Sequence, residues 1–125
     1  MIGCIGIIVT QYYDSENKKN SFKKRPALIV SGPRNNDYTV LPISSISKKE
    51  NIDEKYDIKI EPEEYPLLNL KKISYIRTHK QTIVHQNSIT DKPISSLKDE
   101  YKDLYENVIA SWMEFEYEAF GNSLD

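Results

Sequence analysis

The sequence predicts a mainly β fold of the α+β class: a small antiparallel barrel or strongly curved sheet, closed by one C-terminal helix. Short segments rich in β-branched residues, separated by Gly, Pro, Asn and Asp, fill most of the chain before Ser96. From Ser96 onward the apolar period becomes that of a helix. The 125 residues can form one hydrophobic core. We therefore expect a single domain over residues 1–125, with the barrel in about 1–92 and the helix in about 96–120.

Six segments are expected to be strands because β-branched and aromatic residues dominate them. They are Cys4–Thr10, Pro26–Ser31, Tyr38–Ile43, Tyr56–Glu61, Ile73–Thr78 and Gln81–Gln86. The run from Gly32 to Asp37 is a turn signal, so the second and third strands should be joined by a tight loop. In the fourth strand, strict alternation predicts that Asp57 lies on the exposed face.

Polar connections separate these strands. We interpret Tyr12–Lys24 as a mobile surface loop, long enough to act as a lid or a binding loop. Pro62–Lys72 contains two prolines and should be a connection or a short helical turn. His79 and Lys80 are expected at a bend between the last two strands.

The C-terminal helix is predicted from an apolar stripe whose members step by three or four residues. The stripe consists of Leu97, Tyr101, Leu104, Val108, Trp112, Phe115 and Ala119. Ser96 followed by Asp99 resembles a capping box, and Pro93 and Gly121 frame the helix. This helix would be longer than a small barrel needs, so its far end is expected to serve an interface.

Charge is distributed unevenly along the chain, whose net charge is −2. Residues 1–95 contain 15 Lys and Arg against 11 Asp and Glu, a balance of +4, and residues 96–125 contain 2 against 8, a balance of −6. A basic body of this kind favours an anionic ligand. Solvated lysine-rich loops and an acidic helix that merely keep the protein soluble would give the same pattern.

The sequence offers no support for membrane, secreted or metal-dependent classes of protein. No apolar run approaches the roughly 18 residues of a membrane span, and no basic segment precedes the apolar N-terminus as in a secretory signal. The single cysteine, Cys4, cannot form an internal disulfide and fits a cytoplasmic location. Metal-ligand spacings and phosphate-binding glycine motifs are absent from the sequence, so we expect no metal and no cofactor.

Arg25 and Ser44 are the first candidates for a functional site. If the second and third strands pair, these two residues meet near one end of the sheet. Pro26 favours an extended Arg25, and a guanidinium presents a rigid fork of donors suited to phosphate. An ordinary surface arginine and a strand-end serine are the simpler alternatives.

Tyr75, Arg77 and His79 share parity, so their side chains would line one face if the strand continues. A histidine near neutrality beside a cation and a phenol suits phosphodiester chemistry. A solvated strand face is the simpler alternative.

Four stretches, in this order, resemble the PemK/MazF family of toxin-antitoxin ribonucleases. They are GIIV at Gly6–Val9, KKRPALIVS at Lys23–Ser31, YTVLPISS at Tyr38–Ser45 and SYIRTHKQTIV at Ser74–Val84. The resemblance covers most of the chain and implies an SH3-like barrel with a C-terminal helix that forms a homodimer, with metal-independent, sequence-specific endoribonuclease activity on single-stranded RNA. It also implies a cognate antitoxin whose acidic, initially disordered segment fills a basic groove.

The resemblance also implies roles for individual residues. The arginine of the family's RP motif and a Thr or Ser at the end of the following strand lie at the active site, which corresponds here to Arg25 and Ser44. We expect Arg25 to stabilise the phosphorane, Ser44 to orient a phosphate oxygen, and His79 to act as general base or acid. The expected RNA-binding residues are Lys23, Lys24, Ser45, Arg77 and Lys80. The alternative function is a non-catalytic barrel that binds RNA or an acidic partner peptide.

Overall fold

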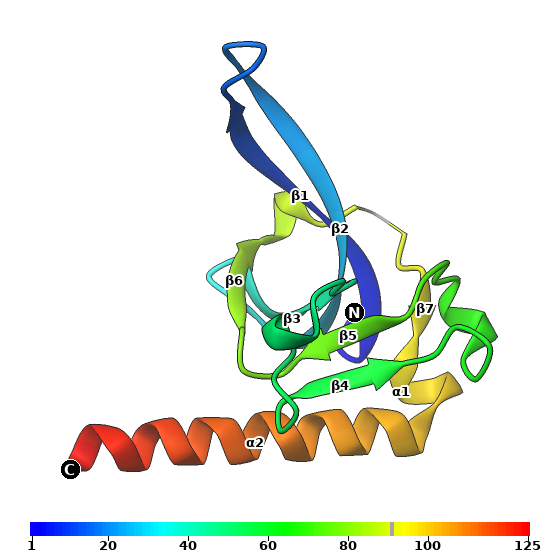
Figure 1. Ribbon diagram of the computed structural model, residues 1–125, viewed down its shortest axis with the longest axis vertical. Coiled ribbons are helices and arrows are strands. Elements are labelled where there is room, and N and C mark those ends of the chain that lie inside the picture. The colour runs from blue at the N-terminus through cyan, green and yellow to red at the C-terminus, as the bar shows by residue number, and fades with distance from the viewer. Residues whose placement is uncertain (91) are drawn as a thin grey trace.

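A computed structural model describes residues 1–90 and 92–125, which form a curled antiparallel sheet with a long C-terminal helix beside it (Figure 1). The strands are β1 (Cys4–Asp14), β2 (Lys19–Arg34), β3 (Asp37–Ser44), β4 (Asp57–Ile60), β5 (Ser74–Arg77), β6 (Thr82–His85) and β7 (Ser95–Ser96). The helices are α1 (Leu97–Glu100) and α2 (Lys102–Leu124), and the 3-10 turns are η1 (Lys49–Asn51), η2 (Pro66–Leu68) and η3 (Gln86–Ser88). The sheet is a curled half-barrel, so the predicted fold class is confirmed.

β3 lies at the junction of the sheet, whose order is β4-β5-β3-β2-β1-β7 with β6 also paired to β3. One edge of β3 pairs with β2. The other edge pairs with β6 through Asp37–Val40 and then with β5, where Ser44 lies opposite Tyr75. Because β5 and β6 divide this edge, the last residues of β3 lie between β2 and β5.

The turn between β2 and β3 follows directly from its sequence. Arg34 pairs with Asp37, which leaves the two-residue loop Asn35-Asn36. Both asparagines have positive φ angles, 52° and 68°, as a type I′ turn requires, and Asn tolerates this conformation better than most residues. The predicted tight loop between these strands is therefore confirmed.

Both faces of the central strands are buried, which explains the unbroken apolar run Ala27–Val30 in β2. Leu28 and Val30 pack in the main core between the sheet and the helices, together with Ile5, Leu41, Ile43, Ile60, Leu68, Ile76, Leu97, Leu104 and Val108. Ala27 and Ile29 point to the opposite face, in a smaller core with Ile8, Val40 and Ile89. Alternate residues of one strand thus serve two cores.

Tyr12–Lys24 is a β-hairpin and not the loop that its polar composition predicts. The paired residues continue from Thr10 opposite Lys23 to Asp14 opposite Lys19, and Figure 1 shows this ribbon projecting from the sheet. Asp14 orders the turn because its Oδ1 accepts hydrogen bonds from the amides of Glu16 and Asn17, at 3.0 and 3.3 Å. We call residues 10–24 the arm.

The C-terminal helical region differs from the single helix expected over 96–120. Ser96 caps α1 by accepting a hydrogen bond from the Asp99 amide, at 3.2 Å, but Tyr101 (φ −138°, ψ 67°) interrupts the helix. The Tyr101 hydroxyl accepts a hydrogen bond from the Leu67 amide at 3.1 Å, which ties this break to η2. Gly121 lies inside α2, which ends at Leu124.

Only the first half of α2 is buried against the sheet. Leu104 and Val108 are buried, whereas Met113, Tyr117 and Phe120 are exposed beyond them, and Figure 1 shows the C-terminal half extending past the sheet. Within residues 1–90 and 92–125, no helix combines the length and the apolar character needed to cross a membrane.

Candidate functional site

Arg25 and Ser44 lie in one open cavity of about 430 Å³. The β2–β3 ladder pairs Ala27 with Pro42, so continuing its register by two residues brings Arg25 opposite Ser44. The same cavity is lined by Lys24, Ser45, Lys71 and Lys72, among other residues. The structure therefore brings together the two residues that the hairpin argument places at one end of the sheet.

The cavity is strongly cationic. Lys24, Arg25, Lys71 and Lys72 all line it, and none of its described lining residues is acidic. Arg25 is exposed, and in the described part of the chain every side-chain hydrogen bond and ion pair of an arginine belongs to Arg77. The charge of Arg25 is thus not neutralised by a described side chain and is available to an anion.

Lys71 and Lys72 were not among the residues selected from the sequence. They follow η2 and precede β5, so the connection between β4 and β5 carries them to Arg25 from the other side of the cavity. The only local signal for them in the sequence is that two consecutive lysines directly precede the predicted strand Ile73–Thr78. Nothing local in the sequence shows which face of the sheet this connection crosses.

A second cavity, of about 390 Å³, adjoins the first. It is lined by Ser44, Ser45, Ile46, Ser47, Asn51, Arg77 and Lys80. Because both cavities share Ser44 and Ser45, we refer to them together as the basic groove. Of the predicted RNA-binding residues, Lys24, Ser45, Arg77 and Lys80 line this groove.

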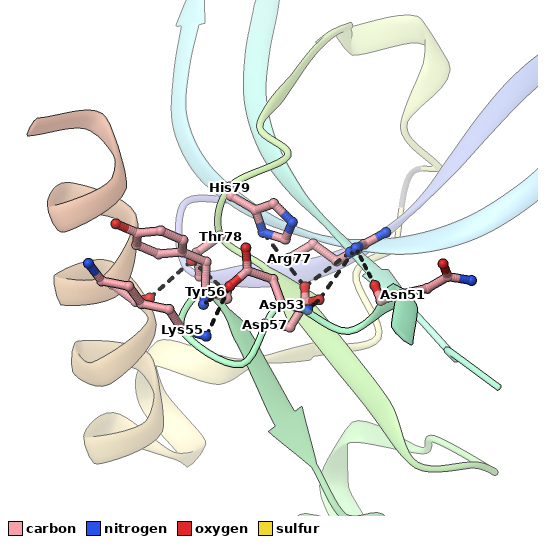
Figure 2. A network of polar contacts seen from close by, with 9 residues as sticks. Asn51, Asp53, Lys55, Tyr56, Asp57, Arg77, Thr78 and His79 are labelled. Atoms are coloured by element: carbon pink, nitrogen blue, oxygen red, sulfur yellow. Dashed lines mark hydrogen bonds and ion pairs between the residues drawn. The ribbon is translucent and has the colours of Figure 1, made fainter. Parts of the chain in front are cut away.

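Arg77 is held by a buried carboxylate, as Figure 2 shows. Its Nε donates to Asp57 Oδ1 at 3.0 Å, and its Nη2 donates to Asp57 Oδ2 at 3.4 Å and to the Asn51 carbonyl at 3.2 Å. Asp57 Oδ2 also accepts a hydrogen bond from the Asp53 amide, at 2.8 Å. The prediction that Asp57 is exposed is wrong: its side chain is fully buried, because the paired guanidinium compensates its charge.

His79 lies beside this ion pair and not among the residues that line the basic groove. Its side chain is 12% exposed, and its Nδ1 lies 3.7 Å from Asp57 Oδ1, with no hydrogen-bond partner among the described residues. The imidazole packs near the rings of Tyr56 and Phe115, each at a centroid distance of 6.2 Å. We call Asp57, Arg77, His79 and the backbone of Asn51 and Asp53 the Asp57 cluster.

Lys23 lies on the arm, outside the residues that line the groove. Its Nζ lies 4.4 Å from the centroid of the Tyr12 ring, a cation–π contact. Tyr13 and Phe22 are exposed on the same ribbon, at 63% and 67%. The arm therefore presents aromatic and basic side chains next to Arg25.

The segment between η1 and β4 is also fastened to α2. The Tyr56 hydroxyl donates a hydrogen bond to Glu118, and the Lys55 ammonium lies 3.2 Å from the same carboxylate. The hydrogen bond from Tyr56, followed by the contact with Lys55, keeps the pKa of Glu118 below its usual value. Thr78 Oγ1 donates to the Tyr56 carbonyl at 2.6 Å and lies 3.0 Å from Ser111 Oγ.

No group of three or more His, Cys, Asp or Glu side chains in the described ranges is arranged to hold a metal ion. A sequence model of the family described as PemK-like, MazF-like toxin of type II toxin-antitoxin system matches residues 5–113. The search of curated proteins gives no match. The family match runs from the second residue of β1 through β7 and α1 to Met113, at about the middle of α2.

Proposed function

The chain belongs to the PemK-like, MazF-like toxins of type II toxin-antitoxin systems, and from this we propose that it is a sequence-specific, metal-independent endoribonuclease that cleaves single-stranded RNA such as mRNA. The observation that carries the proposal is the Arg25 guanidinium, which pairs with no described carboxylate and lies with Ser44 in a cavity whose described lining has four cations and no acidic residue. A scissile phosphate is the anionic group that such a cavity would bind.

In the proposed reaction, the ribose 2′-oxygen attacks the adjacent phosphorus and the bond from phosphorus to the 5′-oxygen breaks. The products are a 2′,3′-cyclic phosphate and a 5′-hydroxyl end, so a proton leaves the 2′-hydroxyl and one reaches the 5′-oxygen. Arg25 stabilises the additional charge on the phosphorane and is a candidate donor to the leaving oxygen. Ser44 holds a phosphate oxygen by a hydrogen bond. The general acid or base role of His79 stays a prediction from the sequence.

RNA would follow the basic groove on both sides of Ser44. Lys24, Ser45 and Lys80 would contact phosphates there, together with Lys71 and Lys72. The arm contributes Lys23 and its exposed aromatic rings, on which unpaired bases can stack. Arg77 is the remaining member of the predicted RNA-binding set, and its guanidinium is already paired with the Asp57 carboxylate.

The partners follow from the family. Membership of a type II toxin-antitoxin family implies a cognate antitoxin, and we propose that its acidic, disordered segment occupies the same cationic groove. We propose a homodimer whose contact includes the exposed end of α2, where Trp112, Met113, Tyr117 and Phe120 border an apolar hollow. The cytoplasm, where mRNA is translated, is the proposed location.

The test is incubation with a long single-stranded RNA in EDTA, with Arg25→Ala and Arg34→Ala assayed beside the wild type. We expect discrete cuts with cyclic phosphate ends from the wild type and from Arg34→Ala. Arg34 is a matched control because it is exposed on the same strand at the distant hairpin turn. Cleavage by Arg25→Ala should fall on the order of a hundredfold or more.

Equal cleavage by Arg25→Ala and the wild type would overturn the assignment of Arg25. RNA binding that weakens steeply with salt, without any cut, would favour the alternative of a non-catalytic binding barrel. A substrate with 2′-deoxyribose at the cleavage site should resist cutting, because it lacks the attacking oxygen.

A further inference from the structure

We propose that Asp57 is a positioning residue that, through Arg77, holds residues 45–53 as a preformed wall of the basic groove. This inference rests on the proposed function, since the wall is argued to serve RNA. It assigns Arg77 to the support of the groove and not to contact with phosphate, which was its predicted role.

One buried carboxylate connects three parts of the chain. Asp57 begins β4, Arg77 ends β5, and Asn51 and Asp53 belong to the connection that leaves β3 at Ser44. The carboxylate accepts hydrogen bonds from two nitrogens of Arg77 and from the Asp53 amide, and Arg77 Nη2 also reaches the Asn51 carbonyl (Figure 2). This carboxylate is thus the main polar link between the connection and the two strands, beside one backbone hydrogen bond from the Asp57 amide to the Asp53 carbonyl at 2.9 Å.

The connection has little other support on its groove side. The 3-10 turn η1 contains no buried residue, its N-cap residue Lys48 makes no side-chain capping hydrogen bond, and Ser45 and Ser47 are exposed. Ser45, Ser47 and Asn51 nevertheless line the groove beside Ser44. Because residues 45–53 have few buried apolar contacts, polar contacts are needed to hold this segment in one conformation.

The burial of Asp57 is easier to explain by geometry than by stability. A buried ion pair usually contributes little net stability compared with apolar residues of similar size. It does fix direction, since a bidentate guanidinium and carboxylate must lie in one plane. His79 belongs to this support: it packs near Tyr56 and Phe115, whose rings also contact each other, and its Nδ1 lies 3.7 Å from Asp57 Oδ1.

The charge change caused by Asp57→Asn separates positioning from simple electrostatics. This substitution removes one negative charge next to the groove, so electrostatics alone predicts tighter RNA binding. It also sets an amide NH₂ against the donors of Arg77 and Asp53, which breaks the cluster. A positioning role therefore predicts weaker binding and slower cleavage, the opposite sign.

The experiment compares the wild type, Asp57→Asn, Arg77→Lys and Asp103→Asn. Asp103 is exposed on α2, so its substitution reproduces the change in charge away from the groove. Arg77→Lys keeps the cation but loses the fork, and it provides a second route to the same defect if Asp57→Asn unfolds. The measurements are kcat and KM for RNA cleavage, binding of a fully 2′-O-methylated RNA that cannot be cut, and amide hydrogen exchange across residues 45–53.

We expect Asp57→Asn and Arg77→Lys each to lower kcat/KM by about tenfold to a hundredfold. Both should weaken binding of the modified RNA and speed exchange in residues 45–53. A fifth protein that combines Asp57→Asn with Arg77→Lys should be little worse than either single variant, because both substitutions break the same link. Asp103→Asn should match the wild type in all three measurements.

Unchanged exchange in residues 45–53 of a folded Asp57→Asn protein would overturn the inference, and so would RNA binding as tight as that of the wild type. If the wild type cuts no RNA, the proposed function fails while the inference is still decided by exchange and by binding. Faster exchange with weaker binding in the two variants would then support Asp57 as the anchor of a binding groove.

Discussion

Arg25 and Arg77 lie on either side of the same two serines but are placed in opposite electrostatic surroundings. Arg25 is exposed in a cavity whose described lining has no acidic residue, whereas Arg77 donates to a fully buried Asp57 and to a backbone carbonyl. A guanidinium that already has a carboxylate supports the protein, and one without a carboxylate is available to a ligand. The surroundings of each arginine, and not its residue type, distinguish these two roles.

The largest expected difference is between Arg77→Ala and Arg25→Ala: the first should mainly lower stability, and the second should mainly lower activity. Arg77→Ala leaves the buried Asp57 carboxylate without its cation and should lower the free energy of unfolding by about 3 kcal/mol. Arg25→Ala should change that free energy by less than about 0.5 kcal/mol, although it removes most of the cleavage. Urea unfolding of both variants measures this, and an Arg77→Ala protein as stable as Arg25→Ala would break the comparison.

Substitutions of Ser44 test whether its hydroxyl contributes to catalysis beside Arg25. Ser44→Ala should lower kcat/KM about tenfold or more, because a hydrogen bond to a charged phosphate oxygen is worth about 1.5–3 kcal/mol. Ser44→Thr keeps the hydroxyl and should retain most of the activity. Equal rates for the Ala and Thr variants would mean that Ser44 only ends the strand.

A substitution of Lys72 tests whether the lysines in the cavity with Arg25 contact RNA phosphates. Lys72→Ala should weaken RNA binding several-fold and reduce the slope of log affinity against log salt by about 0.7, the value for one phosphate contact in single strands. Lys102→Ala removes an exposed lysine of α2 that lies 3.9 Å from Glu106, and it should leave the slope unchanged. A slope equal to the wild-type value for Lys72→Ala would remove Lys72 from the RNA path.

The smallest effect is expected on thermal stability, from the hydrogen bond between Tyr56 and Glu118 that joins the segment before β4 to α2. The hydrogen bond from Tyr56 lowers the pKa of Glu118, so its stabilisation is present above the ordinary Glu pKa of about 4.3 and is lost as pH falls through the lower folded value. The difference in Tm between the wild type and Tyr56→Phe should therefore shrink between pH 7 and pH 3. Tyr117→Phe, which changes a tyrosine that is 81% exposed, should show no such trend.

The meeting of Arg25 and Ser44 could be predicted because its signals are local. Pro26, the apolar run of β2 and the turn residues before β3 lie within one short stretch of sequence, and a hairpin needs no distant partner. The C-terminal helix was predictable for the same reason, from its apolar period and from the Ser96 cap. Its interruption at Tyr101 was not, because that break involves a contact with η2.

The burial of Asp57 and the shape of the arm could not be predicted from local pattern. Asp57 follows a clean alternation, but its partner Arg77 is twenty residues away in the sequence and overrides the period. Tyr12–Lys24 has the polar composition of a loop, and its strands form because the residues on either side are already paired. In both cases strand pairing decided the outcome against composition, across one turn for the arm and between two strands twenty residues apart for Asp57.

The arm also leaves two long strand edges open. Among the described residues, Thr10–Asp14 and Lys19–Lys23 pair only with each other, so their outward backbone groups could accept a strand from another molecule. Lysine side chains on an edge strand disfavour such edge-to-edge aggregation. The lysines on or beside these two edges are Lys18, Lys19, Lys23 and Lys24. Lys23 and Lys24, two of the residues that we propose bind RNA, are therefore also expected to protect the arm against pairing with another molecule.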